Sequence, residues 1–238
     1  MPTRIEKLQA HAGHLLDAFI QLRERYALLE PMLFNQDVAS ARGSGSQARG
    51  FRILKNSLFL SCAQDIAKLL TDRYETTPSI GNLIRALADD ALRAELKDQF
   101  AQRRTGYVET ENDPEILEVL RQWELLEEVG RREQFDALHL EATQLWARLS
   151  TSPLVNGFRT IRDTVTAHTE VRFVADKYQL VDVSALGIKW GDLRVVIKDM
   201  QRLVELLGQL IRTAGFAWEV LDAQLEKASS GFWGQPRA

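Results

Sequence analysis

Cysteine is almost missing from this 238-residue chain, which contains only Cys62. No disulfide can form within the chain, and a lone thiol in the apolar run 58–63 predicts an inert buried side chain rather than a nucleophile. Long apolar stretches are missing too: no run reaches the roughly 18 residues of a membrane span, so no transmembrane helix is expected. The first residues are charged and lack the apolar core of a signal peptide. The expected compartment is therefore the cytoplasm.

A dominant charge of one sign is also absent. Lys and Arg total 30 against 33 Asp and Glu, a net charge of −3, so no overall basic field draws the protein to nucleic acid. His11 and His14 lie one turn apart, but no carboxylate or cysteine completes an obvious metal-ligand set. No HExxH motif or paired-carboxylate spacing occurs either, which disfavours a metal-dependent hydrolase. We expect no metal and no cofactor.

What the chain does contain is helical periodicity. A helix over about 3–34 is predicted by one apolar seam with alternating spacings of four and three, made of Leu8, Ala12, Leu15, Phe19, Leu22, Tyr26, Leu29 and Leu33. Pro31 should end or kink this helix near Glu30. Residues 35–49 contain a Gly/Ser-rich stretch that predicts a loop.

Further helices are predicted over about 50–73, 80–104 and 114–150. Ser79 and Asp113 are the expected N-caps, Pro114 takes a first-turn position, and Gly130 is a candidate interruption. A segment from about 173 to 188 should be irregular or extended.

The last helix is predicted over about 190–228. It carries a strict heptad seam that calls for a helical partner, antiparallel and within the same bundle: Leu193, Val196, Met200, Leu203, Leu207, Leu210, Ala214, Ala217 and Leu221. The predicted fold class is all-α, a multi-helix bundle with long antiparallel helices. Residues 1–228 should form a single domain, and 229–238 a flexible tail.

The only segment that combines a proton-transfer group with a phosphate-binding group lies on a predicted helix over about 154–172. Arg162 has a planar guanidinium that matches phosphate oxygens, and the imidazole of His168 titrates near neutral pH. Asp163 could orient a neighbouring side chain or form a local pair with Arg159. On residues alone, the alternative for His168 is a helix C-terminal histidine stabilised by the helix dipole.

Spacing by itself does not place these groups in one site. Residues 162 and 168 point about 240° apart on an ideal helix, so a shared site needs a long Arg reach, a helix that ends near His168, or a second subunit. Residues 148–172 carry a charge balance of +2, including Arg148. Arg159 and Arg172 are candidate contacts to a nucleic-acid backbone, with solvated helix-face charges as the alternative.

The sequence Ile161-Arg162-Asp163, followed after three residues by Ala167-His168, resembles the signature of the HEPN superfamily (higher eukaryotes and prokaryotes nucleotide-binding). Other segments resemble its abortive-infection U-type branch. These are the run from Leu58 to Leu70, the Pro78-Ser79-Ile80 helix start, and Trp190-Gly191-Asp192-Leu193. The resemblance covers roughly residues 5–225.

The resemblance implies a homodimer in which two motifs face each other, and a metal-independent endoribonuclease acting on RNA in phage defence or a toxin–antitoxin system. Arg162 and His168 would carry the reaction and Asp163 would tune them. It also leaves room for an antitoxin or a nucleotidyltransferase as a protein partner. The alternative is a non-catalytic helical interaction or nucleotide-binding module, in which Arg162 and His168 pack or bind a partner.

Overall fold

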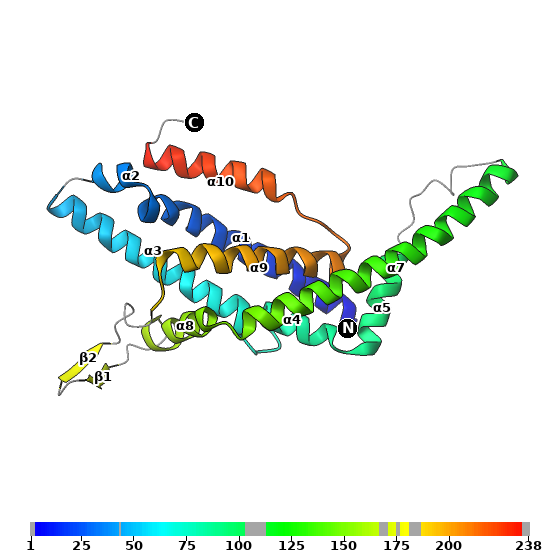
Figure 1. Cartoon of the computed structure of the whole chain (residues 1–238), viewed down its shortest axis with the longest axis horizontal. Coiled ribbons are helices and arrows are strands. Elements are labelled where there is room, and N and C mark those ends of the chain that lie inside the picture. Colours follow the sequence, from blue (N-terminus) through cyan, green and yellow to red (C-terminus); the bar gives the residue numbers. More distant parts are fainter. Residues whose placement is uncertain are drawn as a thin grey trace.

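The computed structural model describes residues 3–42, 44–102, 113–166, 171–174, 177–180 and 187–234. Its long axis follows four long helices, shown in Figure 1: α1 (Arg4–Phe34), α3 (Ser46–Thr71), α7 (Pro114–Ser150) and α9 (Trp190–Arg212). Shorter elements connect or flank them: α2 (Gln36–Ser40), α4 (Ile80–Leu87), α5 (Asp90–Ala101), α8 (Pro153–Ile161), η1 (Arg162–Thr166), β1 (Val171–Val174), β2 (Lys177–Leu180) and α10 (Trp218–Trp233).

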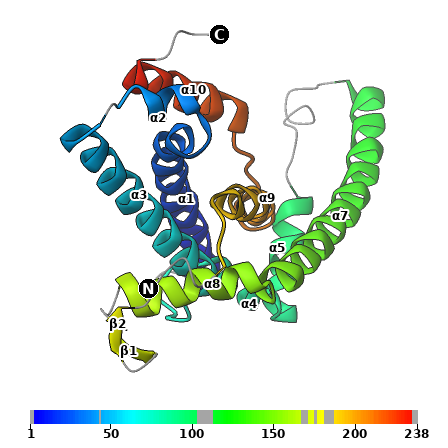
Figure 2. The same ribbon diagram turned by 60° about the vertical axis from the view of Figure 1, so that its left-hand side comes forward.

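α9 lies at the centre of the bundle, with α1 on one side and α7 on the other (Figure 2). It is antiparallel to both. Gln9 and Glu30 of α1 bond Ile211 and Arg194 respectively, and Glu141 and Arg148 of α7 bond Arg202 and Asp199. The predicted seam on α9 is buried from Leu193 to Leu210. The structure thus confirms the expected antiparallel partner of this seam, and both α1 and α7 take that role.

α1 extends to Phe34, as the predicted helix over about 3–34 requires, so of the two outcomes predicted at Pro31 the ending of the helix does not occur. Proline has no N–H to donate to the carbonyl oxygen of Ala27, four residues earlier. That oxygen instead accepts a 2.7 Å bond from the hydroxyl of Ser229, and the neighbouring Leu28 oxygen accepts one from the Trp233 indole at 3.1 Å. Side chains of α10 therefore satisfy the backbone around the proline, and α1 continues to Phe34.

The predicted helix over 80–104 is two helices. Ser79 is the N-cap of α4 as expected, and its buried hydroxyl accepts from the Asn82 amide at 3.2 Å. The chain turns at Ala88, and the carboxylate of Asp89 caps α5 by accepting from Leu92 N–H at 3.1 Å. A second strong capping residue in the middle of the apolar pattern explains the break. By contrast, α7 runs unbroken through Gly130, with Asp113 as its cap.

The predicted helix over 190–228 is also divided. Thr213 adopts a left-handed conformation with φ of 50° and ends α9. α10 then runs beside α1, where the Trp218 and Phe19 rings meet edge to face at 5.8 Å. It continues to Trp233, so the tail predicted from residue 229 is helical over 229–233. The loop predicted over 35–49 likewise contains α2, and α3 begins four residues earlier than expected.

The all-α fold class is confirmed, with one addition. β1 and β2 form an antiparallel hairpin in which Val171 pairs with Leu180. Figure 1 shows this hairpin at the end of the molecule opposite the projecting tip of α7. The helix predicted over 154–172 is therefore wrong at residues 171–172, which lie in β1, and residues 167–170 lie outside the described residues. Among the described helices, none has the length and apolarity to cross a membrane.

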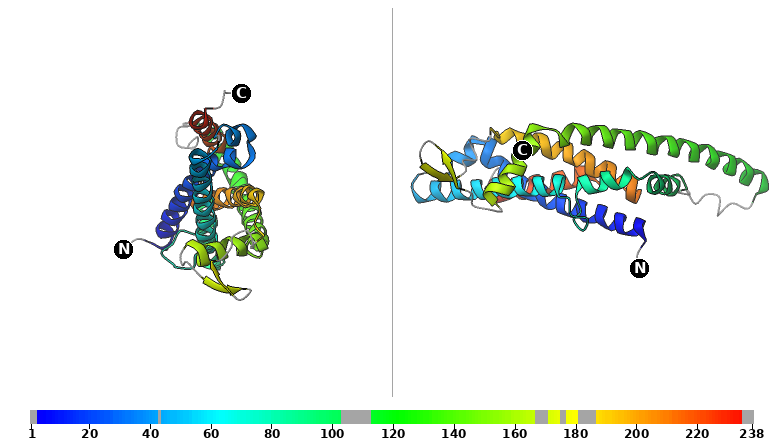
Figure 3. Two further views of the ribbon diagram at one scale, coloured as in Figure 1. Left: turned by 90° about the vertical axis from the view of Figure 1, so that its left-hand side faces the viewer. Right: turned by 90° about the horizontal axis from the view of Figure 1, so that it is seen from below.

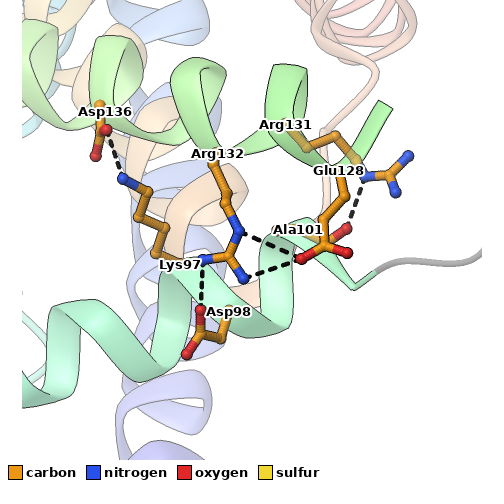
Figure 4. Close-up of polar contacts among 7 residues, drawn as sticks. All are labelled: Lys97, Asp98, Ala101, Glu128, Arg131, Arg132 and Asp136. Carbon is orange, nitrogen blue, oxygen red and sulfur yellow. Dashed lines mark hydrogen bonds and ion pairs between the residues drawn. The ribbon is translucent and has the colours of Figure 1, made fainter. Parts of the chain in front are cut away.

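A polar clamp joins α5 to the middle of α7 (Figure 4). Arg132 pairs with Asp98 at 2.6 Å and with Glu128 at 3.0 Å, and Lys97 pairs with Asp136 at 2.5 Å. Arg131 donates to the Ala101 carbonyl oxygen, the last of α5, at 2.8 Å. Beyond this clamp the first half of α7 extends past the rest of the bundle (Figure 3).

Candidate functional site

The segment that carries the candidate residues begins as a short helix docked on α3. The Ser152 hydroxyl caps α8 and Pro153 occupies its first turn, the position where a missing N–H has no cost. Val155, Phe158 and Ile161 follow at three-residue spacing and are all buried. This apolar face packs α8 against α3 and fixes which way its polar face points.

The helix changes form at Arg162. Residues 162–166 make a π-helical turn, a rare form that is frequent at functional sites. The buried Thr164 hydroxyl of this turn donates to the Thr160 carbonyl oxygen of α8 at 2.7 Å. The angles of an ideal α-helix therefore do not hold over residues 162–166, because the chain leaves the α-helix at Arg162.

Arg162 and Asp163 form a local ion pair. Arg162 Nε donates to Asp163 Oδ1 at 2.7 Å, and the arginine side chain is only 26% exposed. A contact this short orients the plane of the guanidinium.

Beside Arg162 the structure has an open cleft of about 590 Å³ between α3 and α8. Four of its lining residues are basic: Lys68, Arg73, Arg159 and Arg162. The rest of the lining is Gln64, Thr71, Asp72 and Tyr74. Gln64, Lys68 and Thr71 recur at four and three residues and so share one face of α3. Arg159 and Arg162 are three residues apart on the facing segment.

Three of the four basic side chains of the cleft are not engaged in ion pairs within the described residues, whereas Arg162 pairs with Asp163. Lys68, Arg73 and Arg159 form no ion pair with any residue that the structure describes. Asp72, the only acid in the lining, has Oδ1 engaged by the Tyr74 N–H at 3.1 Å. The arrangement is therefore a locally basic cleft on an acidic protein, suited to holding phosphate groups.

The predicted site residues are placed as follows. Arg159 and Arg162 line one cleft, and Asp163 adjoins it. Arg148, counted in the basic balance, is drawn away to Asp199 on α9 at 3.3 Å. Arg172 lies in β1, but its side chain is outside the part of the chain that the structure describes, and His168 lies outside the described residues altogether.

Lys68, Arg73 and Tyr74 were missed as site residues. They lie roughly 90 residues before the motif, and the pairing of α3 with α8 brings them together. One signal was available: Lys68 interrupts the apolar run near the end of the predicted helix, four residues after Gln64.

Other candidate groups are accounted for by packing. Cys62 is fully buried, so the predicted burial of its thiol is confirmed, and this burial raises the pKa of the thiol to about 12. Burial, followed by Lys7 and His14, lowers the pKa of His11. Within the described ranges no group of three or more His, Cys, Asp or Glu side chains could hold a metal ion.

Comparison with known protein families identified a family that covers almost the whole chain. The family model HEPN_AbiU2, described as AbiU2, matches residues 5–232, nearly the whole chain. No curated protein and no solved structure matches the chain.

Proposed function

Because the chain belongs to the AbiU2 family of HEPN proteins, we propose that it is a metal-independent endoribonuclease that acts as a homodimer. It carries a HEPN-type domain over residues 5–232. The observation that supports the proposal best is the basic cleft in which Arg162, the first residue of the motif, lies beside Arg159, Lys68 and Arg73. A phosphate group is the ligand that such a cleft suits.

The proposed reaction is cleavage of an RNA phosphodiester by its own 2′-hydroxyl. A base removes the 2′-hydroxyl proton, the 2′-oxygen bonds to phosphorus, and the P–O5′ bond breaks as an acid protonates the leaving oxygen. The products are a 2′,3′-cyclic phosphate and a 5′-hydroxyl end. His168 would supply the proton-transfer group, since its imidazole titrates near neutral pH.

Arg162 would stabilise the negative charge that develops on the phosphate, and Asp163 would orient its guanidinium through the Nε contact. One histidine per chain serves as base and acid less readily than two, which is why a dimer with two facing motifs belongs to the proposal. A role in phage defence, alone or with an antitoxin or nucleotidyltransferase, is the biological setting that the family suggests.

The test is an RNA cleavage assay in EDTA, with total cellular RNA and tRNA as substrates. Wild type should cleave and leave cyclic-phosphate ends, and His168→Ala should reduce the rate by about 10²–10⁴. His14→Ala is the matched control, because His14 is 71% exposed on α1 and away from the cleft. Light scattering should give the mass of a dimer.

Cleavage that persists in correctly folded His168→Ala would remove that histidine from the mechanism. A folded wild-type dimer that cleaves no RNA would favour the non-catalytic interaction module instead.

A further inference from the structure

Tyr74 is held in an ordered turn at the cleft, yet its ring is exposed. Its N–H donates to Asp72 Oδ1 at 3.1 Å, and its carbonyl oxygen accepts from Thr77 N–H at 2.9 Å and from the Asn82 side-chain amide at 2.7 Å. Tyr74 is nevertheless 78% exposed, more than any other large hydrophobic residue that the structure describes as exposed.

The turn is anchored to the body of the bundle on both sides. Asn82, which also donates to the Thr77 carbonyl oxygen at 3.0 Å, belongs to α4. The buried Ser79 hydroxyl donates to the Asp72 carbonyl oxygen at 2.8 Å. An isolated exposed tyrosine is ordinary. Here a fixed backbone presents an aromatic face, so a ligand that stacks on it would order little more than the ring itself.

The same turn carries cations. Arg73 immediately precedes Tyr74, Lys68 lies in the last turn of α3, and both line the cleft that contains Arg162. Neither pairs with an acid in the described residues. An aromatic face beside unpaired cations is the combination that holds single-stranded nucleic acid, because bases stack while phosphates are neutralised.

We infer that Tyr74, Arg73 and Lys68 form a strand-binding subsite for single-stranded RNA next to the motif. A base stacks on Tyr74, and the adjoining phosphates contact Arg73 and Lys68, leading the strand to Arg162. The choice of RNA rests on the proposed function. The subsite itself is a binding element contributed by α3 and its following turn, and it can be tested without any cleavage.

The experiment measures binding of the full-length protein to a short fluorescein-labelled 2′-O-methyl oligonucleotide by anisotropy. This probe keeps the bases and phosphates but has no 2′-hydroxyl to attack, so binding is separated from catalysis. Tyr74→Ala should weaken binding about tenfold, whereas Tyr74→Phe, which keeps the ring, should stay within about twofold of wild type. Lys68→Ala and Arg73→Ala should each lower the slope of log affinity against log salt by about 0.7.

Matched controls exist on the same molecule. Arg52 is exposed on α3, sixteen residues or about 24 Å before Lys68, and Phe232 is a 61% exposed ring on α10. Arg52→Ala and Phe232→Ala should leave affinity and salt slope unchanged.

The outcomes distinguish the strand-binding subsite from the proposed ribonuclease activity. Loss of binding in Tyr74→Ala and the two cation variants, with no cleavage of ordinary RNA by wild type, supports the subsite and contradicts the ribonuclease. Cleavage by wild type with unchanged affinity in all three variants overturns the subsite alone. Displacement of the probe by free ATP as readily as by unlabelled strand would show a mononucleotide pocket and also overturn it.

Discussion

The two halves of α7 belong to one unbroken helix but lie in opposite environments. From Phe135 onward the helix buries Phe135, Ala142 and Leu149, one residue every seven, against the bundle. Before Gly130 it exposes an apolar stripe with spacings of three and four residues, made of Ile116, Val119, Trp123 and Leu126, which are 47%, 66%, 50% and 73% exposed.

The difference arises from where the neighbouring helices end. α5 ends at Ala101, whose carbonyl oxygen meets Arg131. α9 ends at Arg212, and its last residues line a small cleft together with Arg131 and Gln134. Residues of α7 before about 130 therefore run beyond both packing partners, as Figures 1 and 3 show. Heptad spacing predicts that a helix has an apolar face, but it does not predict whether another helix covers that face.

The largest effect expected from this comparison is on stability. Phe135→Ala should lower the free energy of unfolding by about 3–5 kcal/mol, because it empties a fully buried position. Trp123→Ala, an equally drastic truncation on the same helix, should change it by less than about 0.5 kcal/mol. Urea denaturation of both variants measures the difference. Similar losses at both positions would mean that the exposed stripe is covered in solution.

A substitution at Gly130 is expected to raise the free energy of unfolding, by less than the Phe135 substitution lowers it. A Cβ there meets nothing within 4 Å, so Gly130→Ala should stabilise the projecting half by up to about 1 kcal/mol through helix propensity alone. Hydrogen exchange of the amides over 116–129 should slow. Gly81→Ala is the control, since its Cβ meets the Leu70 carbonyl oxygen at 3.0 Å and the Trp146 ring at 3.2 Å and should not share that gain. Unchanged exchange in Gly130→Ala would mean that this half is held by contacts rather than by propensity.

The smallest effect is a pH dependence confined to the packed half. Burial, and secondarily Arg93, lowers the pKa of His139 below 6.5, while Asp136 acts in the opposite direction. The folded state therefore disfavours the protonated imidazole of His139. The contribution of neutral His139 to the free energy of unfolding is complete above pH 6.5, and it is lost as the pH falls from 6.5 through the lower pKa of His139 in the folded state. When the pH is lowered from 6.5 through this folded-state pKa, the melting temperature of His139→Gln should fall by less than that of wild type. An identical acid-induced loss in both proteins would contradict this.

Local chemistry made several features predictable. The apolar seam of α1, the Ser79 and Asp113 caps and both ends of α7 follow from residues within a few positions of one another. The failures share a cause. The local rule that a proline ends or kinks a helix does not take account of Ser229, about 200 residues later, which donates to the carbonyl oxygen that Pro31 leaves without its helical partner. Asp89 and Thr213 break periodic patterns that by themselves suggest continuous helices.

The residues of the candidate site also fall into a group that the sequence predicts and a group that only the tertiary structure adds. Arg159, Arg162 and Asp163 are recognisable in the sequence because the motif is local, a few residues on one short segment. Lys68, Arg73 and Tyr74 join them only because the buried face of α8 packs on α3 and brings two distant segments to one cleft. Side-chain type and short-range spacing decide which residues are capable of the chemistry. Long-range packing decides which of them meet, since the energy of an apolar contact is the same whether its partner lies near in the chain or far from it.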